Sequence, residues 1–262
     1  NMDADFDLLT NMNKFKIQTK GALKNNNCDL KIISHRFNLG DAIGLLPSNI
    51  IIPYKKDLGT INTSFVAKYN GDIQNINYDN INLKGNIYSN KGAKSAIIVD
   101  NSNFELKNSK LKLPLLQGTF NKSPYRISIN ISDMFGSKRE VNGDCKISSL
   151  NLNLINDSSI QLLLPPQTAK IFNDLDFVNG NINLSAKVRN NNVNAFTILD
   201  NVSFIYKPKN LKVAISSGNM FLKNDLLHLN KINALLGKMP VFIDGKVTNI
   251  QKNPNANLYI NA

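Results

Sequence analysis

Alternation of apolar and polar residues is the feature that most constrains the fold of this chain of 262 residues. In the segment 181–188, every second residue from Ile182 to Val188 is apolar, and the residues between them are polar. A period of two places the apolar side chains on one face of a β-strand. The segments 202–206 and 241–247 alternate in the same way, and Asn-Gly pairs mark turns between such segments. The sequence therefore predicts a mainly β fold of antiparallel strands, each with one apolar face.

Two segments break this period and predict short helices. In the segment 166–175, Ala169, Phe172 and Leu175 recur at helical spacing, and Pro166 suits a first helical turn. The segment 38–46 is a shorter and weaker counterpart earlier in the chain. We expect one or two short helices for each group of strands.

A long internal repeat is indicated by matches at a nearly constant spacing. The segment 102–113 resembles the segment 218–229, which begins 116 positions later, and both contain Leu-Lys-Asn. Further along the chain, the segment 123–127 aligns with the segment 239–243 at the same spacing. Several matches in the same order indicate a repeated structural unit.

The other half of the unit repeats at slightly larger spacings. The segment from Cys28 to Pro47 resembles that from Cys145 to Pro165, and 59–68 resembles 180–187. The segment 14–21 reads like 241–247, as the end of an earlier copy. We therefore predict the end of a preceding repeat at 1–21, a first repeat at 22–131 and a second at 132–262, within a longer chain.

The net charge of +12 arises from 31 Lys and Arg residues against 19 acidic residues. Such a balance can draw a protein to nucleic acid, to anionic polysaccharide or to an anionic membrane surface. The cations are scattered along the chain and form no basic run. The aromatic residues occur within apolar faces and not in Lys/Arg clusters, which favours core packing over base stacking. We therefore predict no nucleic-acid partner; a basic binding module is the alternative, and steep salt dependence would indicate it.

The residues that carry chemistry are few. No nucleophile elbow, phosphate-binding loop or zinc-protease motif occurs, and His35 and His228 are the only histidines. Cys28 and Cys145 lie outside any CxxC and occupy equivalent places in the two repeats, which favours two buried thiols over a disulfide. The sequence predicts a protein that is not an enzyme and has no cofactor and no metal.

The segment 180–262 contains a recurring sequence pattern: a small loop, a Gly or Pro, an alternating strand and Gly-x-Val. Its parts are 180–187, 200–208, 217–229 and 236–247. This sequence pattern resembles that of the AsmA-like proteins, the bacterial envelope group that includes the DUF3971-type and TamB-like chains. With the first repeat, the resemblance covers most of the chain.

The resemblance implies a curved, groove-like or elongated sheet in a periplasmic protein that is anchored in the inner membrane and serves outer membrane biogenesis. Such a groove would hold phospholipid acyl chains; membrane contact would come from parts outside this segment, and other partners would be envelope proteins. No apolar run approaches the roughly 18 residues of a membrane helix. The alternative is a structural or adhesion-type β-repeat scaffold that binds partners through its outer surface. The candidate groove residues are Ile61, Phe65, Ile182, Leu184, Val188, Val202, Phe204, Tyr206, Val241, Ile243 and Val247.

Overall fold

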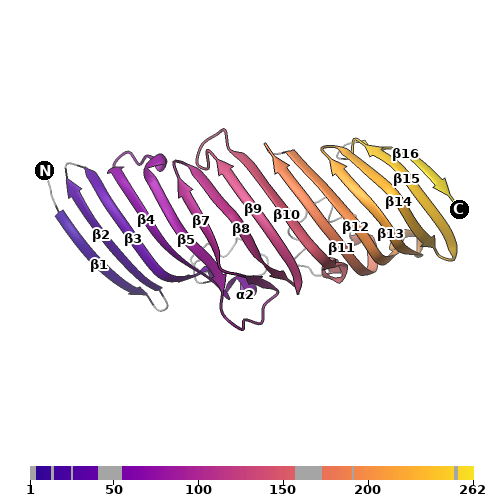
Figure 1. Ribbon diagram of the computed structural model, residues 1–262, viewed down its shortest axis with the longest axis horizontal. Coiled ribbons are helices and arrows are strands. Elements are labelled where there is room, and N and C mark those ends of the chain that lie inside the picture. The colour runs from indigo at the N-terminus through magenta and orange to yellow at the C-terminus, as the bar shows by residue number, and fades with distance from the viewer. Residues whose placement is uncertain are drawn as a thin grey trace. The chain divides into compact units, whose positions relative to one another are not determined.

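The fold is mainly β (Figure 1). The computed structural model describes residues 4–12, 15–24, 26–40, 55–156, 173–190, 192–250 and 253–262. These described residues form 16 strands and a few short helices. The predicted fold class, antiparallel strands in a curved sheet with few helices, is confirmed.

The chain divides into two compact units. Unit 1 comprises residues 1–120 and 126–143, and unit 2 comprises residues 121–125 and 144–262. The strands within unit 1 are β1 (Ala4–Met12), β2 (Phe15–Lys24), β3 (Asn27–Asn38), β4 (Ile61–Asp72), β5 (Ile81–Ser89), β6 (Ile97–Val99), β7 (Ser102–Lys107) and β8 (Lys110–Phe120). Those within unit 2 are β11 (Leu175–Arg189), β12 (Asn192–Tyr206), β13 (Leu211–Lys223), β14 (Leu226–Leu236), β15 (Met239–Thr248) and β16 (Asn255–Asn261). Parts of β9 (Ser123–Ser132) and β10 (Glu140–Asn151) belong to each unit.

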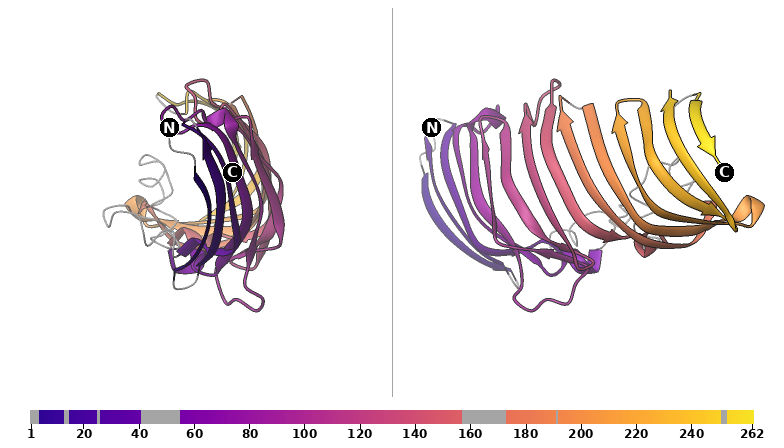
Figure 2. Two further views of the ribbon diagram at one scale, coloured as in Figure 1. Left: turned by 90° about the vertical axis from the view of Figure 1, so that its left-hand side faces the viewer. Right: turned by 45° about the vertical axis from the view of Figure 1, so that its right-hand side comes forward.

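Strands that follow one another in the chain are paired within each unit. In unit 1 the order is β1-β2-β3-β4-β5-β7-β8, with the short β6 also paired to β8. In unit 2 the order is β11-β12-β13-β14-β15-β16. Hairpins make such pairing easy, because an antiparallel neighbour needs only a short turn. Figure 2 shows that the strands of each unit bend along their length.

The helices are short: α2 (Lys55–Leu58) is followed by the 3-10 helices η1 (Tyr78–Asn80), η2 (Leu152–Asn156) and η3 (Lys207–Lys209). The predicted helix at 38–46 lies mostly outside the described residues. Within its described part, Leu39 and Gly40 are helical. Most of the predicted helix at 166–175 also lies outside them. Its last residue was assigned wrongly, because Leu175 is the first residue of β11 and pairs with Tyr206.

The segments matched by sequence fall on equivalent elements in the two units. The β7–β8 hairpin turns at Asn108 and Ser109, and the β13–β14 hairpin turns at Asn224, each with a positive φ. One hairpin later, Asn121 and Gly237 both have positive φ. This correspondence supports the repeat hypothesis, while the repeat boundaries stay a prediction.

The core of unit 2 lies on one side of its sheet. Leu152 in η2 packs with four buried strand residues, Val178, Leu199, Val202 and Ile232. Half-buried side chains pack around this cluster, among them Ile182, Phe204, Ile215, Met220, Leu229 and Ile243. We call this side of the unit 2 sheet its core face and the opposite side its outer face.

Candidate functional site: an apolar sheet face with a groove

The core face of unit 2 stays apolar across the five strands β11 to β15, because β-bulges return apolar residues to this face where the alternation alone would not. Leu199 and Val202 are three positions apart in β12, a spacing that would place them on opposite faces of a regular strand. Asn201 between them has a φ of 49°, and the extra residue of the bulge returns Val202 to the face of Leu199. Leu229 and Ile232 in β14 are related in the same way, around Lys231 with a φ of 51°.

These bulges also account for the bend of the strands. The register shifts in β11, in β13 and in β14 near residue 231, so neighbouring strands are irregular at similar levels. A bulged strand bends and twists more strongly than a regular one. The backbone N–H groups at irregular positions have partners: Lys231 N–H donates to Asp244 Oδ2 at 3.1 Å, and Gly180 N–H donates to Asn179 Oδ1 at 2.8 Å.

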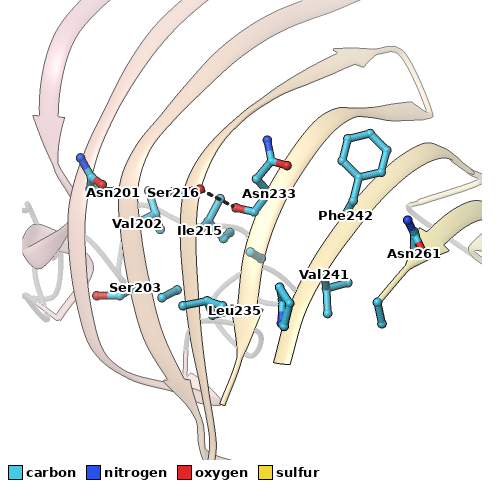
Figure 3. A pocket seen from close by; sticks show the side chains of 14 residues that line it. Asn201, Val202, Ser203, Ile215, Ser216, Asn233, Leu235, Val241, Phe242 and Asn261 are labelled. Carbon is cyan, nitrogen blue, oxygen red and sulfur yellow. Dashed lines mark hydrogen bonds between the residues drawn. The ribbon is translucent and has the colours of Figure 1, made fainter. Parts of the chain in front are cut away.

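A groove lies over strands β12 to β16 (Figure 3). Its volume is about 580 Å³. Val202, Ile215, Ala234 and Val241 form one row across four strands, because each pairs with the next in register. Most of the remaining lining alternates with this row along the strands and therefore belongs to the outer face. It comprises Ser203, Ala214, Ser216, Asn233, Leu235, Pro240 and Phe242, with Asn201, Asn261 and Ala262 beside them. Ser216 Oγ donates to the backbone carbonyl of Asn233 at 3.3 Å, so one of the polar groups in the lining is engaged within the sheet.

The structure brings the nine candidates of unit 2 together on the core face. A second row, Leu184, Thr197, Met220, Leu229 and Gly245, is formed by direct strand pairing in the same way, and Ile232 and Ile243 lie between the two rows. Among the candidates, Val202 and Val241 are each only 5% exposed, so their side chains belong to the core, although both residues border the groove. The others are half-buried, and these are Ile182, Leu184, Val188, Phe204, Tyr206, Ile243 and Val247.

The two candidates of unit 1 lie in different surroundings. Ile61 is 3% exposed and is therefore a core residue of unit 1. Phe65 is half-buried and meets Phe37 edge to face, with ring centroids 6.1 Å apart. Neither lines the apolar pocket of about 310 Å³ between β3, β4 and the residues before β5.

That pocket of unit 1 was missed by the sequence reasoning. Its lining is Cys28, Leu30, Ile32, Ala67, Lys68, Tyr69, Ile73, Ile76 and Ile81. Alternation from Cys28 to Ile32 could have found the strand face. The contributions of Ile73 and Ile76 could not be found in this way, because they belong to the irregular connection between β4 and η1.

The opposite face of the unit 1 sheet is charged. Lys84 pairs across the sheet with Glu105, and their Nζ and Oε1 atoms are 2.9 Å apart. The hydrogen bond from Lys84 lowers the pKa of Glu105. Lys112 pairs with Glu105 on the next strand. Unit 1 therefore combines an apolar face with a solvated, charged one, as the alternation predicts.

The described residues offer no arrangement suited to metal chemistry: no group of three or more His, Cys, Asp or Glu side chains is placed to bind an ion. Cys28 and Cys145 are free thiols, but the predicted burial holds only for Cys28, because Cys145 is half-buried. Burial raises the pKa of the Cys145 thiol. Among the described helices, none has the length and apolar content needed to cross a membrane.

Comparison of the chain with protein-family models, with curated proteins and with solved structures gives no match. The candidate site therefore rests on the residues and geometry above: a bent sheet face of unit 2 that is apolar across five strands.

Proposed function

We propose that the core face of this protein holds the acyl chains of phospholipid, as a non-enzymatic segment of an envelope lipid-transport protein. The observation that carries the proposal is the set of half-buried apolar side chains on the core face, among them Ile182, Phe204 and Ile243, which lie around the buried cluster. A hydrocarbon chain needs only apolar surface to displace water from such a face. Each methylene buried there contributes about 0.8 kcal/mol.

Further half-buried side chains extend the proposed binding surface along the strands. Leu184, Met220 and Leu229 lie in the second row, and Val247 lies one row further. Contact with lipid would remove the water-exposed part of these side chains from solvent. The proposed setting is the periplasm, with membrane contacts supplied by parts of the protein outside this segment.

A scaffold that acts through its outer surface is the second candidate. It is favoured by the cluster of Leu152, Val178, Leu199 and Ile232, whose members are already buried without a ligand. If the whole core face behaved like this cluster, it would need no lipid. The two functions differ in whether the core face carries a ligand when the protein is purified.

Native mass spectrometry of the protein after expression in a bacterial envelope, with lipid extraction of the same sample, separates the two functions. We expect phospholipid to co-purify with the wild-type protein. Leu184→Asp places a carboxylate on the core face and should remove most of the bound lipid, because a buried charge without a partner is costly. Phe204→Asp tests the same face from β12.

The matched control is Asn183→Asp, one position from Leu184 on the exposed opposite face. Its new carboxylate can still accept the hydrogen bond that Ser149 N–H donates to Asn183 Oδ1 at 2.9 Å. This variant should keep its lipid. A folded wild-type protein with a lipid-free mass would exclude the acyl-chain proposal and favour the scaffold.

A further inference from the structure

The outer face of unit 2 carries exposed apolar side chains next to lysines. Phe196 in β12 pairs directly with Phe221 in β13, and the two are 40% and 39% exposed. Ile198, two positions after Phe196 on the same face, is 41% exposed. These three residues point away from the core face, because their chain neighbours Thr197, Leu199 and Met220 belong to the core-face rows.

Three lysines from three different strands surround these side chains. Lys187 in β11 and Lys223 in β13 both pair with Asn194, which lies between them on β12. Lys246 in β15 pairs with His228, which in turn pairs with Phe221. We call Phe196, Ile198, Phe221, Lys187, Lys223 and Lys246 the lysine-flanked patch.

The three lysines of the patch form no ion pair within the part of the chain that the structure describes, and all three are exposed. Of the acidic residues nearby, Asp144 pairs with Arg189 at 3.0 Å. Asp244 accepts a hydrogen bond from Lys231 N–H and keeps its charge two positions from Lys246 on the same face. Asp225 lies in the turn beyond Lys223.

We infer that the lysine-flanked patch binds the surface of an anionic lipid bilayer. Aromatic and aliphatic side chains partition into the headgroup region, and lysines nearby attract anionic headgroups. The long lysine side chains can lie along the sheet while their ammonium groups reach the lipid phosphates. Phe196 and Phe221 could stack on bases, but Ile198 could not, whereas all three side chains can enter the headgroup region of a bilayer. This favours a bilayer over single-stranded nucleic acid.

Along the chain the aromatic residues and the cations are separate, and the sequence therefore favours core packing for the aromatic residues. For Phe196 and Phe221 this prediction is wrong, because both are exposed beside lysines. Strand pairing places Lys187 and Lys223, which are 36 positions apart in the chain, on either side of one residue of β12. The inference does not depend on the proposed function, because acyl chains would occupy the core face and the bilayer would meet the outer face.

Co-sedimentation with phosphatidylcholine vesicles, prepared with and without phosphatidylglycerol, tests the inference. We expect the wild-type protein to bind only the anionic vesicles and to dissociate as salt is raised. Lys187→Gln/Lys223→Gln/Lys246→Gln should weaken binding on the order of a hundredfold, from about fivefold for each lysine. Phe196→Ser/Phe221→Ser should also weaken binding, and both positions are exposed enough to tolerate serine.

The matched control is Lys209→Gln/Lys212→Gln/Lys238→Gln, which removes the same charge from exposed positions of unit 2 outside the patch. It should bind vesicles almost as well as the wild type. An equal loss in both triple variants would overturn the inference, since net charge alone would then explain binding. The inference would also be overturned if the wild-type protein did not bind anionic vesicles. It would be overturned as well if the patch substitutions weakened binding of a single-stranded oligonucleotide and not of vesicles. Leu184→Asp should still bind vesicles, so failure of the acyl-chain proposal can be told apart from failure of this one.

Discussion

At the scale of single residues, a buried asparagine organises the polar contacts of unit 1. Asn62 is 0% exposed, and its Nδ2 donates to Asn90 Oδ1 at 2.9 Å. Its Oδ1 accepts from Arg36 Nε and from Asn38 Nδ2, both at 3.2 Å. Buried amides are tolerated when they are hydrogen-bonded in this way, and they are costly to remove because their partners lose their contacts.

Asn62→Ala should therefore destabilise the protein by about 2 kcal/mol, because Arg36, Asn38 and Asn90 would lose a shared partner inside the fold. Urea unfolding followed by circular dichroism measures the change. Asn86→Ala is the control, since it removes one exposed hydrogen bond, to Asn101, and should cost less than about 1 kcal/mol. Equal losses in both variants would contradict a structural role for the buried network.

Cys145 gives a prediction about pH at the same scale. Burial disfavours the thiolate, so the raised pKa means that less thiolate is present at mildly alkaline pH than in an unfolded chain. In the Cys28→Ser protein, alkylation of native Cys145 should be slower than in urea, and its rate should level off at a higher pH. A native rate profile that coincides with the profile in urea would contradict the effect of burial.

At the scale of elements, a glycine permits two strands to approach where the unit 2 sheet is irregular. Gly180 in β11 has a φ of 109°, a conformation that L side chains rarely adopt. A Cβ at this position would lie 2.4 Å from the carbonyl oxygen of Asn201 and 2.6 Å from the Cα of Val202. These are backbone atoms beside the bulge, so the neighbouring strand itself would have to move.

Gly180→Ala should destabilise unit 2 by about 3 kcal/mol through the combined strain and clash. The control is Gly237→Ala in the β14–β15 turn, where φ is 65° and nothing lies within 4 Å of the added Cβ. That variant should lose only about 1 kcal/mol, from the backbone conformation alone. Thermal and urea unfolding of the two variants compare these costs, and a Gly180 variant as stable as the control would show that the strands separate easily.

At the scale of the whole molecule, the strand order makes stability local within each unit. Most pairings join strands that are neighbours in the chain, as in repeat proteins whose stability is a sum of unit and nearest-neighbour contributions. A destabilising substitution in one unit should then lower the stability of that unit much more than the stability of the other. This expectation rests on the repeat hypothesis.

Hydrogen exchange of the Gly180→Ala protein tests this locality. Amide protection should fall in β11, β12 and β13 of unit 2, while β3, β4 and β5 of unit 1 keep the protection of the wild type. A uniform fall across both sets of strands would mean that the units unfold as one cooperative body.

The sequence alone determined the class of fold and the apolar face of each regular strand. The alternation from Ile182 to Val188 places these residues correctly, because a strand has a period of two whatever its neighbours are. The same reasoning grouped Val202 with Phe204 and Val241 with Ile243. It was less successful at Leu175, because a helical spacing in a short segment does not outweigh pairing with a partner strand.

Only the tertiary structure decided how these strands combine. The bulges at Asn201 and Lys231 are not visible as a period, yet they keep Leu199 and Val202, or Leu229 and Ile232, on one face. The patch around Phe196 likewise depends on register, because Lys187, Lys223 and Lys246 become neighbours only when their strands pair. The physical reason is that alternation is a local property of the backbone, whereas register and bulges are set by packing between strands.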